Sequence, residues 1–555
     1  MKHLRSCVCL LLAVLLVAAL GLPAFADGET YSITVENTNT NVTISGNTYY
    51  AYKLFDVSYS ADKSSYAYKV TSDFAGFAYD GKSGEALLTA LEALTSNSAE
   101  MNAFAKAALA YVQTNSISPT GNVTIAEKSQ TGTISLSTPG YYLVSGSATA
   151  DGGQTITAAC SLTTTAPSAT INPKVDAPKL DKHILMQNAD GSTTKLAANS
   201  ANIGDIIPFE ITSQVPNTTG YNKYIFQVTD TLTKGMEYIE SSLQVYVGDV
   251  KLRMSFQGDN TYSQVFTYIA GAPAEMKVIF HEFQKHTPGL PIKIKYSAVV
   301  TEKVDMTATG NVNEAKLTYS NNPNFTYEGD KPGGNAPVGE TPKSVTKTYS
   351  TALRLAKVNE QGQSLTGAKF TVSGNGKRIT LLNGQAFYPD DTGRYYMLKD
   401  GTYTTQEPTE ETRNAYDSIT QKYRKVDYID NRNADVAFNT SGYVDKDGYL
   451  TIQGLSDGTY TITEAIAPEG YNLLKEPITI TISSTPTLEG PNWVVKQGET
   501  PLTAKDNAYC FQVVNKTGTL LPATGGMGTT IFYLLGSVMA LAAGIILITK
   551  KRMAA

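Results

Sequence analysis

Alternating apolar and polar positions run through most of this chain. Segments such as Tyr31–Val35, Tyr49–Val57 and Leu353–Val358 place aliphatic or aromatic residues at close to every second position, which is typical of half-buried strands. Two segments, 84–95 and 100–114, instead place Leu, Ala and aromatic residues at helical spacing. The pattern predicts a mainly β protein of tandem immunoglobulin-like β-sandwich domains, with a helical insert in the first domain.

Proline-punctuated segments divide the β-rich region. Residues 173–178 and 326–347 are extended and rich in Pro, Gly and polar residues, so we expect them to be linkers. They separate an N-terminal domain at 27–172, a middle domain at 179–325 and a C-terminal domain at 348–516. A chain of 555 residues is long enough for this number of cores.

Both ends of the chain carry membrane-related signals. Residues 1–26 combine a basic start, an apolar run and small residues before Ala26, which predicts a secretory signal peptide cleaved after Ala26. Residues 527–549 carry no charge and are long enough for a transmembrane helix. The basic tail 550–555 should stay in the cytoplasm, leaving the main body outside.

Composition excludes several classes of function. Lys and Arg number 45 against 50 Asp and Glu, and no strongly basic domain stands out, which argues against nucleic acid as a partner. After signal cleavage only Cys160 and Cys510 remain, so a disulfide framework is not expected. His281 and His286 are five residues apart, whereas a zinc helix needs four. We expect no metal, no cofactor and no enzyme of the usual multiple-turnover kind.

A sorting motif precedes the apolar segment. The motif consists of Leu521, Pro522, Ala523, Thr524 and Gly525, and it is followed by the span and the basic tail. This order resembles the LPxTG sorting signal that sortases of Gram-positive bacteria recognise. The resemblance implies that a sortase thiolate attacks the Thr524 carbonyl and cuts the Thr524–Gly525 bond, so the chain is a substrate. It also implies anchoring to peptidoglycan at the cell surface, after transient retention in the membrane.

The C-terminal domain carries a second recognisable motif. Residues 458–471 (GTYTITEAIAPEGY) resemble the E-box of collagen-adhesin B-type domains. The resemblance implies a spontaneous isopeptide bond between Lys357 and Asn515, with Glu464 as its catalyst. Burial would favour the neutral, nucleophilic amine of Lys357 and the protonated carboxyl of Glu464, which is the state that such a condensation needs.

The middle domain repeats this logic with other residues. Residues 227–232 (QVTDTL) resemble a segment of the middle domain of backbone pilins, which points to Asp230 as the acid. We predict a Lys182–Asn313 bond, with Asn321 as the alternative acceptor on the same strand face. The N-terminal domain shows no comparable set, and Lys53 is best interpreted as a solvated strand lysine.

One lysine lies at the boundary of the first two domains. Ile171, Pro173 and Lys174 resemble the end of the pilin motif WxxxVxVYPK, in the place where that family carries it. The motif is incomplete, because three positions depart from it: Thr165, Ala169 and Asn172. The resemblance implies that the Lys174 amine accepts the acyl group in the intersubunit bond, with Lys179 as the fallback nucleophile.

Taken together, the mature chain resembles the backbone pilin of sortase-assembled pili. The resemblance implies a head-to-tail polymer of this chain, built by a class C pilus sortase through a Thr524-to-Lys174 bond, anchored by a housekeeping sortase and supporting adhesion to host or neighbouring-cell surfaces. Ancillary pilins would be further partners. A monomeric wall-anchored adhesin and an ancillary pilin are the alternative interpretations.

Overall fold

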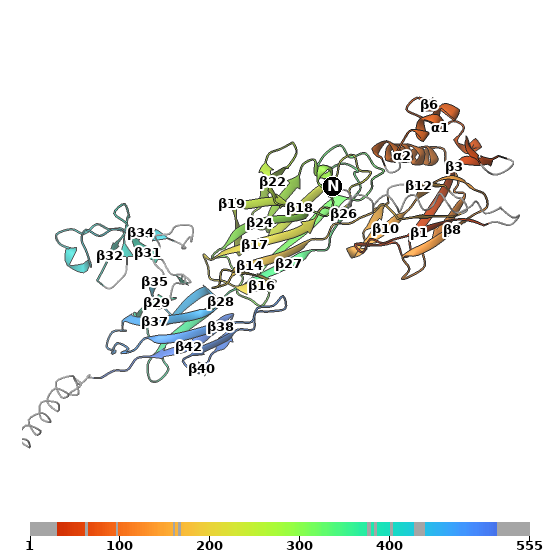
Figure 1. Ribbon diagram of the computed structural model, residues 1–555. Helices are drawn as coiled ribbons and strands as arrows, with labels where there is room; N and C mark the ends of the chain where they lie inside the picture. Colours follow the sequence, from red (N-terminus) through yellow and green to blue (C-terminus); the bar gives the residue numbers. More distant parts are fainter. Residues whose placement is uncertain are drawn as a thin grey trace, which may run out of the picture. The chain divides into compact units, whose positions relative to one another are not determined.

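The structure is a computed structural model that describes residues 30–60, 65–95, 98–158, 161–164, 168–374, 379–381, 386–399, 403–426 and 439–518 (Figure 1). The described chain is mainly β, with two α-helices, which confirms the predicted fold class. It divides into two compact units. The first runs to Ser350 and includes Thr485–Asn492, and the second comprises Thr351–Ser484 and the residues from Trp493 onward.

The N-terminal part of the first unit combines small sheets with a helical pair. Its sheets have the orders β13-β1-β8, β12-β9-β3-β4 with β7 beside β3, β11-β10-β2 and β5-β6. The strands are β1 (Tyr31–Glu36), β2 (Val42–Thr43), β3 (Thr48–Tyr59), β4 (Tyr66–Val70), β5 (Ala78–Tyr79), β6 (Lys82–Ser83), β7 (Gly121–Thr124), β8 (Thr131–Leu136), β9 (Gly140–Ser145), β10 (Ser147–Ala150), β11 (Thr155–Thr157), β12 (Ser161–Thr164) and β13 (Ser168–Ile171).

The predicted helical insert is present as α1 (Gly84–Glu92) and α2 (Ala99–Thr114). The Ser98 side chain caps α2 by accepting a hydrogen bond of 3.1 Å from the backbone N–H of Met101. One apolar face of the helices, with Leu87 and Phe104 at its centre, packs against Leu54 and neighbouring residues of β3. The insert therefore has its own small core, as its helical periodicity predicted.

The middle part of the first unit consists of two sheets with a core between them (Figure 1). Their orders are β15-β14-β17-β24-β19-β20 and β16-β27-β25-β18-β23-β22-β21, with β26 beside β25. The strands are β14 (Asp181–Gln187), β15 (Thr193–Leu196), β16 (Ala198–Ser200), β17 (Ile206–Gln214), β18 (Phe226–Leu232), β19 (Met236–Val247), β20 (Val250–Lys251), β21 (Arg253–Met254), β22 (Thr261–Thr267), β23 (Ala274–Phe280), β24 (Pro291–Val300), β25 (Asn311–Ser320), β26 (Val338–Glu340) and β27 (Ser344–Tyr349).

The segment expected to be the second linker, 326–347, differs from the prediction. Its last part forms β26 and most of β27, both of which pair with β25 in the middle sheet. The physical reason is that residues 344–349 (SVTKTY) alternate and bury Thr346 and Thr348, a strand signal that the preceding Pro- and Gly-rich stretch obscured. The part before Val338 and the three residues between β26 and β27 lie outside strands.

The second unit also contains two principal sheets. Their orders are β30-β36-β28-β42-β41 and β35-β29-β37-β38-β39-β40, and short pairs β31-β34 and β32-β33 lie outside them. The strands are β28 (Thr351–Val358), β29 (Lys369–Ser373), β30 (Thr380–Leu381), β31 (Ala386–Pro389), β32 (Tyr396–Met397), β33 (Tyr403–Thr404), β34 (Tyr423–Val426), β35 (Asn439–Tyr443), β36 (Tyr449–Leu455), β37 (Gly458–Ile466), β38 (Ile478–Ser483), β39 (Val494–Gln497), β40 (Thr500–Pro501), β41 (Thr503–Lys505) and β42 (Ala508–Val514). The first and last strands, β28 and β42, are parallel neighbours.

Candidate isopeptide sites

The middle-domain candidates come from three strands and meet in the core. Lys182 is on β14 in one sheet, whereas Asp230 on β18 and Asn313 on β25 belong to the other. Asp230 lies opposite Ala315, two residues along β25 from Asn313, so both side chains are on the inner face. All three residues are at most 2 % exposed. The structure therefore brings the three residues named from the sequence together in one buried cluster.

Direct contacts join these groups into one network. The Lys182 ammonium forms an ion pair with Oδ2 of Asp230. It also donates to the Tyr296 hydroxyl at 2.5 Å, and the Asn313 Nδ2 group donates to the same hydroxyl at 2.8 Å. Tyr296 in turn donates to Oδ1 of Asp230 at 2.7 Å. The network thus holds the amine, the acid and the side-chain amide around one phenol.

Sequence reasoning missed two tyrosines of this site. Tyr296 on β24 and Tyr238 on β19 both reach the Asp230 carboxylate, and Tyr238 donates to its Oδ1 at 2.8 Å. The signal was available, because Ile292, Ile294 and Tyr296 occupy alternate positions of one strand and are all buried. A buried tyrosine hydroxyl needs a polar partner, and both of these hydroxyls find one in Asp230.

Burial changes the acid–base behaviour of the middle-domain lysine. Desolvation lowers the pKa of Lys182 to about 8, and the nearby Asp230 carboxylate opposes part of that fall. Its ammonium also lies 5.2 Å from the Phe209 ring centroid and 5.1 Å from that of Tyr296. A lysine whose pKa is lowered in this way exists as the neutral amine far more often than a surface lysine does at neutral pH.

The C-terminal candidates also meet in a core. Lys357 is on β28, Glu464 is on β37 in the opposite sheet, and Asn515 follows the last residue of β42. Lys357 pairs with Val513 across the parallel β28–β42 ladder, and the Asn515 amide N–H donates to the Val358 carbonyl at 3.0 Å. The three side chains belong to residues that are 0 %, 3 % and 1 % exposed, in that order.

In this second cluster the acid contacts the amide directly. The Asn515 Nδ2 group donates to both Glu464 carboxylate oxygens, at 2.9 and 3.0 Å. The backbone N–H of Leu474 donates to Oε2 of Glu464 at 2.9 Å and helps to fix its position. The Lys357 ammonium donates instead to the Val513 carbonyl at 2.8 Å. Burial lowers the pKa of Lys357 to about 8, against the attraction of Glu464.

The two predicted acceptors share an unusual feature. Among the described residues, Oδ1 of Asn313 and Oδ1 of Asn515 are buried without a hydrogen-bond partner. Leaving such an acceptor unpaired costs on the order of 1–3 kcal/mol. Each carboxamide therefore uses its nitrogen in a polar network and leaves its carbonyl oxygen without a hydrogen bond, a cost that calls for an explanation at each site.

Asn321, the alternative acceptor, lies elsewhere. It follows the end of β25 at Ser320, and its Nδ2 group donates to the Thr155 carbonyl of the N-terminal part at 3.2 Å. Asn313 is the residue that contacts the Lys182 network. The geometry therefore favours Asn313 over Asn321, although alternation had put both on one face.

The first linker is held more tightly than its proline content suggested. Val175 and Ala177 are buried in the large core of the first unit, and Asp176 accepts hydrogen bonds from Asn39 at 2.9 Å and from the backbone of Asn217 at 2.8 Å. Lys174 is accordingly half-buried, and its ammonium donates to Oδ1 of Asn102 on α2 at 3.1 Å. The expected linker amine is thus oriented by the helical insert.

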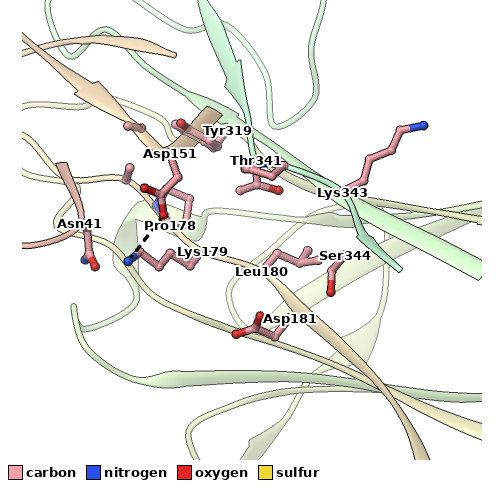
Figure 2. Close-up of a pocket in the computed structure, with 13 residues that line it drawn as sticks. Asn41, Asp151, Pro178, Lys179, Leu180, Asp181, Tyr319, Thr341, Lys343 and Ser344 are labelled. Carbon is pink, nitrogen blue, oxygen red and sulfur yellow. Dashed lines mark ion pairs between the residues drawn. The ribbon is translucent and has the colours of Figure 1, made fainter. Parts of the chain in front are cut away.

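Lys179, the fallback nucleophile, is more exposed. Its side chain is 55 % exposed and its ammonium lies 3.6 Å from Oδ2 of Asp151. Figure 2 shows the two side chains facing one another at a cavity of about 250 Å³, which Asn41 and Lys343 also line. Both lysines remain candidates, one held by an amide and one by a surface ion pair.

Other predicted features fall outside these sites. The signal peptide with Ala26, the motif Leu521–Gly525 with Thr524, the span 527–549 and the tail 550–555 lie outside the described residues. Among the residues that are described, no helix is long and apolar enough to cross a membrane.

Lys53 is less solvated than expected, because its side chain is 13 % exposed and contacts Asp56 at 2.9 Å.

The described residues contain no cluster of side chains suited to a metal ion. His281 uses its two ring nitrogens on Asp330 at 3.0 Å and on Ser263 at 3.1 Å. Glu282 has a φ of 49°, in the left-handed region, which prevents the two histidines from sharing a regular helix face. This pair is therefore a structural feature of the strand end.

Comparisons with known proteins show what the sequence is similar to. Residues 425–492 match the family model described as SpaA, prealbumin-like fold domain. Over 398 residues the chain is 24 % identical to the trypsin-resistant surface T6 protein of Streptococcus pyogenes serotype M6, covering 67 % of this chain and 69 % of that protein.

Solved structures extend the likeness to the fold. The T6 backbone pilin of serotype M6 Streptococcus pyogenes, described as a modular three-domain structure, matches with a TM-score of 0.51 and 14 % identity, over 89 % of this chain and 100 % of that one. The full-length major pilin SpaD from Corynebacterium diphtheriae matches with a TM-score of 0.44 and 15 % identity, over 89 % and 99 %; that score is too low to support an argument. The comparisons confirm the predicted resemblance to backbone pilins of Gram-positive bacteria.

Proposed function

We propose that the chain is the structural backbone subunit of a covalent cell-surface pilus, a substrate of sortases and not a multiple-turnover enzyme. The observation that carries this proposal is the pair of buried Lys–acid–Asn clusters, one in each unit. A lysine–acid ion pair alone would not explain why a buried asparagine amide lies beside the pair in both clusters. The sequence likeness to the T6 surface protein and the fold likeness to the T6 backbone pilin point in the same direction.

Each cluster supports a single intramolecular condensation. The neutral amine of Lys182 or Lys357 attacks Cγ of Asn313 or Asn515, and a C–N bond forms. One proton leaves the lysine nitrogen and one reaches the asparagine nitrogen, which departs with its bonding electrons as ammonia. Asp230 and Glu464 are the acids that relay these protons and end the reaction unchanged.

The products suit a fibre that must resist proteases and denaturants. A buried ammonium and a poorly satisfied carboxamide are replaced by one neutral amide, which removes the cost of the buried charge. Each bond also closes a long loop, and this reduces the entropy of the unfolded chain in the same way as a disulfide. With Cys510 free and no disulfide framework expected, amide crosslinks would provide the covalent reinforcement.

Polymerisation uses the sorting motif near the C-terminus of one subunit and the lysine between the first two domains of the next. A class C sortase cysteine attacks the Thr524 carbonyl, the Thr524–Gly525 bond breaks, and the acyl-enzyme is resolved by the amine of Lys174 on the next subunit. Repetition of this head-to-tail step gives an open fibre. A housekeeping sortase then transfers the fibre to peptidoglycan, and ancillary pilins add adhesive functions.

The experiment that tests this proposal compares cell-wall extracts after boiling in detergent. The wild type should give a ladder of high-mass species on an immunoblot, Lys174→Ala should give monomer, and Lys179→Ala should leave the ladder intact. Mass spectrometry should recover a Thr524–Lys174 crosslinked peptide. A ladder in Lys174→Ala would move the linkage to another lysine, and no ladder in the wild type would favour the monomeric adhesin.

A further inference from the structure

The Tyr296 hydroxyl contacts all three reacting groups of the middle domain. It accepts a hydrogen bond from Lys182 Nζ at 2.5 Å and from Asn313 Nδ2 at 2.8 Å, and it donates to Asp230 at 2.7 Å. Its ring stacks on Phe209 with a centroid distance of 5.3 Å, which fixes the hydroxyl in place. One oxygen atom is therefore adjacent to the nucleophile, the leaving nitrogen and the acid.

The acid of this site does not reach the amide itself. Among the described residues, Asp230 accepts side-chain hydrogen bonds from Lys182, Tyr238 and Tyr296, and none joins it to Asn313. In the C-terminal site, Glu464 accepts directly from Asn515. Aspartate is one methylene shorter than glutamate, and in the middle domain the phenol of Tyr296 spans the remaining gap.

We propose that Tyr296 is a catalytic residue of the middle-domain condensation, the proton relay that connects Asp230 and Lys182 to the leaving nitrogen of Asn313. This inference rests on the proposed function, because it concerns the same intramolecular bond. It assigns the two domains different proton pathways for the same reaction. The C-terminal domain uses its carboxyl group directly, and the middle domain uses a carboxyl group together with a phenol.

The relay balances protons and electrons. Proton transfer within the ion pair gives neutral Lys182 and protonated Asp230. The carboxylic hydrogen of Asp230 then donates to the Tyr296 oxygen. The phenolic hydrogen of Tyr296 is thereby free to point toward Asn313. As Nζ bonds to Cγ, it passes one proton to the Tyr296 oxygen while the phenolic proton moves to Nδ2. The Cγ–Nδ2 bond then breaks, ammonia leaves with the electron pair, and the carbonyl reforms. Tyr296 recovers its starting state, whereas Asp230 keeps the proton that it took from Lys182 and ends as the neutral acid, so charge and protons balance.

The protonation state of the phenol agrees with this role. Burial and the neighbouring Asp230 raise the pKa of Tyr296 far above that of a free tyrosine. The hydroxyl consequently stays protonated at physiological pH and can both accept and donate, as a relay must. It cannot act as a stored anionic base.

The test follows both crosslinks in one molecule. Newly synthesised full chain is pulse-labelled, quenched at intervals and digested, and the Lys182–Asn313 and Lys357–Asn515 peptides are quantified by mass spectrometry. In Tyr296→Phe, which keeps the ring, we expect the middle crosslink to form roughly 100-fold more slowly, within the range of general acid–base catalysis. The C-terminal crosslink should keep its wild-type rate and so report an intact chain.

Two further variants separate a relay from a packing effect. Tyr238→Phe removes a hydroxyl that contacts Asp230 but neither Lys182 nor Asn313, so it should slow the middle crosslink far less. In the double variant Tyr296→Phe with Asp230→Glu, the longer acid should reach the amide and restore most of the rate. Rescue of this kind would not follow if the phenol served only to fill space.

The outcomes are distinguishable from one another. A wild-type rate in Tyr296→Phe, an equal loss in Tyr238→Phe, or the absence of rescue by Asp230→Glu would overturn the relay. Absence of both crosslinks in the wild-type chain would instead overturn the intramolecular bonds of the proposed function. If Tyr296→Phe slowed the C-terminal crosslink as well, the substitution would have disturbed folding. The double variant with Asp230→Glu would then decide whether the relay exists, by whether it restores the middle crosslink.

Discussion

The middle-domain and C-terminal clusters contain the same three kinds of side chain but connect them differently. In the middle domain the acid is paired with the lysine, and a tyrosine contacts the amide. In the C-terminal domain the acid is paired with the amide, and the lysine donates to a backbone carbonyl. Reach explains the difference, since Glu464 extends one methylene further than Asp230. Under the proposed function, one condensation chemistry uses two different cores, in which a shorter acid is accompanied by an additional hydroxyl.

Removal of either acid should give the largest effect and test whether the two sites are independent. Glu464→Ala should abolish the C-terminal crosslink and Asp230→Ala the middle one, each leaving the other intact. Intact mass should rise by about 17 Da per lost bond, since ammonia is retained. Each loss should also lower the free energy of unfolding by about 4–5 kcal/mol, as expected for a long closed loop; a mass unchanged in either variant contradicts the assignment.

Changing the length of the acid should slow the crosslink at the C-terminal site and be tolerated at the middle site. Glu464→Asp should slow the C-terminal crosslink by about 10²-fold or more, because no described tyrosine contacts Asn515 and could bridge the gap between the shorter acid and the amide. Asp230→Glu should be tolerated far better, since Tyr296 already spans the gap. Crosslinked-peptide yields over time provide the measurement. If both substitutions slowed their crosslinks equally, the length of the acid would not explain the difference between the two sites.

The pH dependence should be similar at the two sites, because burial lowers the pKa of both lysines to about 8. The reacting state, a neutral lysine beside a protonated acid, holds the same number of protons as the lysine–acid ion pair. Crosslinking should therefore change little with pH just below pH 8 and slow about tenfold per pH unit above it, as the site loses that proton. A bell-shaped profile at one site only would indicate a second titrating group there.

The same pKa values predict how an uncrosslinked domain responds to pH. In Asn515→Ala the folded state carries Lys357 with a pKa near 8, and the unfolded chain carries it at its ordinary value of 10.5. Between these values the unfolded state binds more protons, so the stability of the variant should rise from about pH 8 to about pH 10.5. Denaturant melts across this window, with Lys357→Met/Asn515→Ala as the control, provide the test.

The smallest effect is expected at the linker lysine. Asn102→Ala removes the amide that holds the Lys174 ammonium and should reduce polymer yield several-fold, since only orientation is lost. Lys106→Ala alters the same face of α2 one turn further on, where Lys106 donates to the Phe325 carbonyl, and should leave the ladder unchanged. Densitometry of cell-wall immunoblots would distinguish the two.

Periodicity was sufficient to predict much of this molecule. Alternation identified the strand faces that carry Lys357 and Asn313, and helical spacing identified the insert. It could not rank Asn313 above Asn321, because the end of β25 depends on pairing with other strands. It places Tyr296 on the same strand face as Ile292 and Ile294, but it could not assign a role to Tyr296, because that role depends on contacts with Asp230 and Asn313 of the other sheet.

The linker predictions show the same limit. Proline and glycine marked residues 326–347 as a connection, but pairing with β25 drew its last part into a sheet. Residues 173–178 keep their extended form, yet Val175 and Ala177 bury themselves in the core. Local sequence fixes backbone preference, whereas the neighbours available in the folded chain decide whether a segment is exposed.

The parallel pairing of β28 with β42 has a mechanical consequence. Both strands run in the same direction, with Lys357 near the end of one and Asn515 just past the end of the other. Once these side chains are joined, a pull on the two ends of the domain travels along β28, crosses the new amide and leaves through the tail. The strands that lie between β28 and β42 in the sequence then carry none of the force, so tension on the fibre does not unfold the domain.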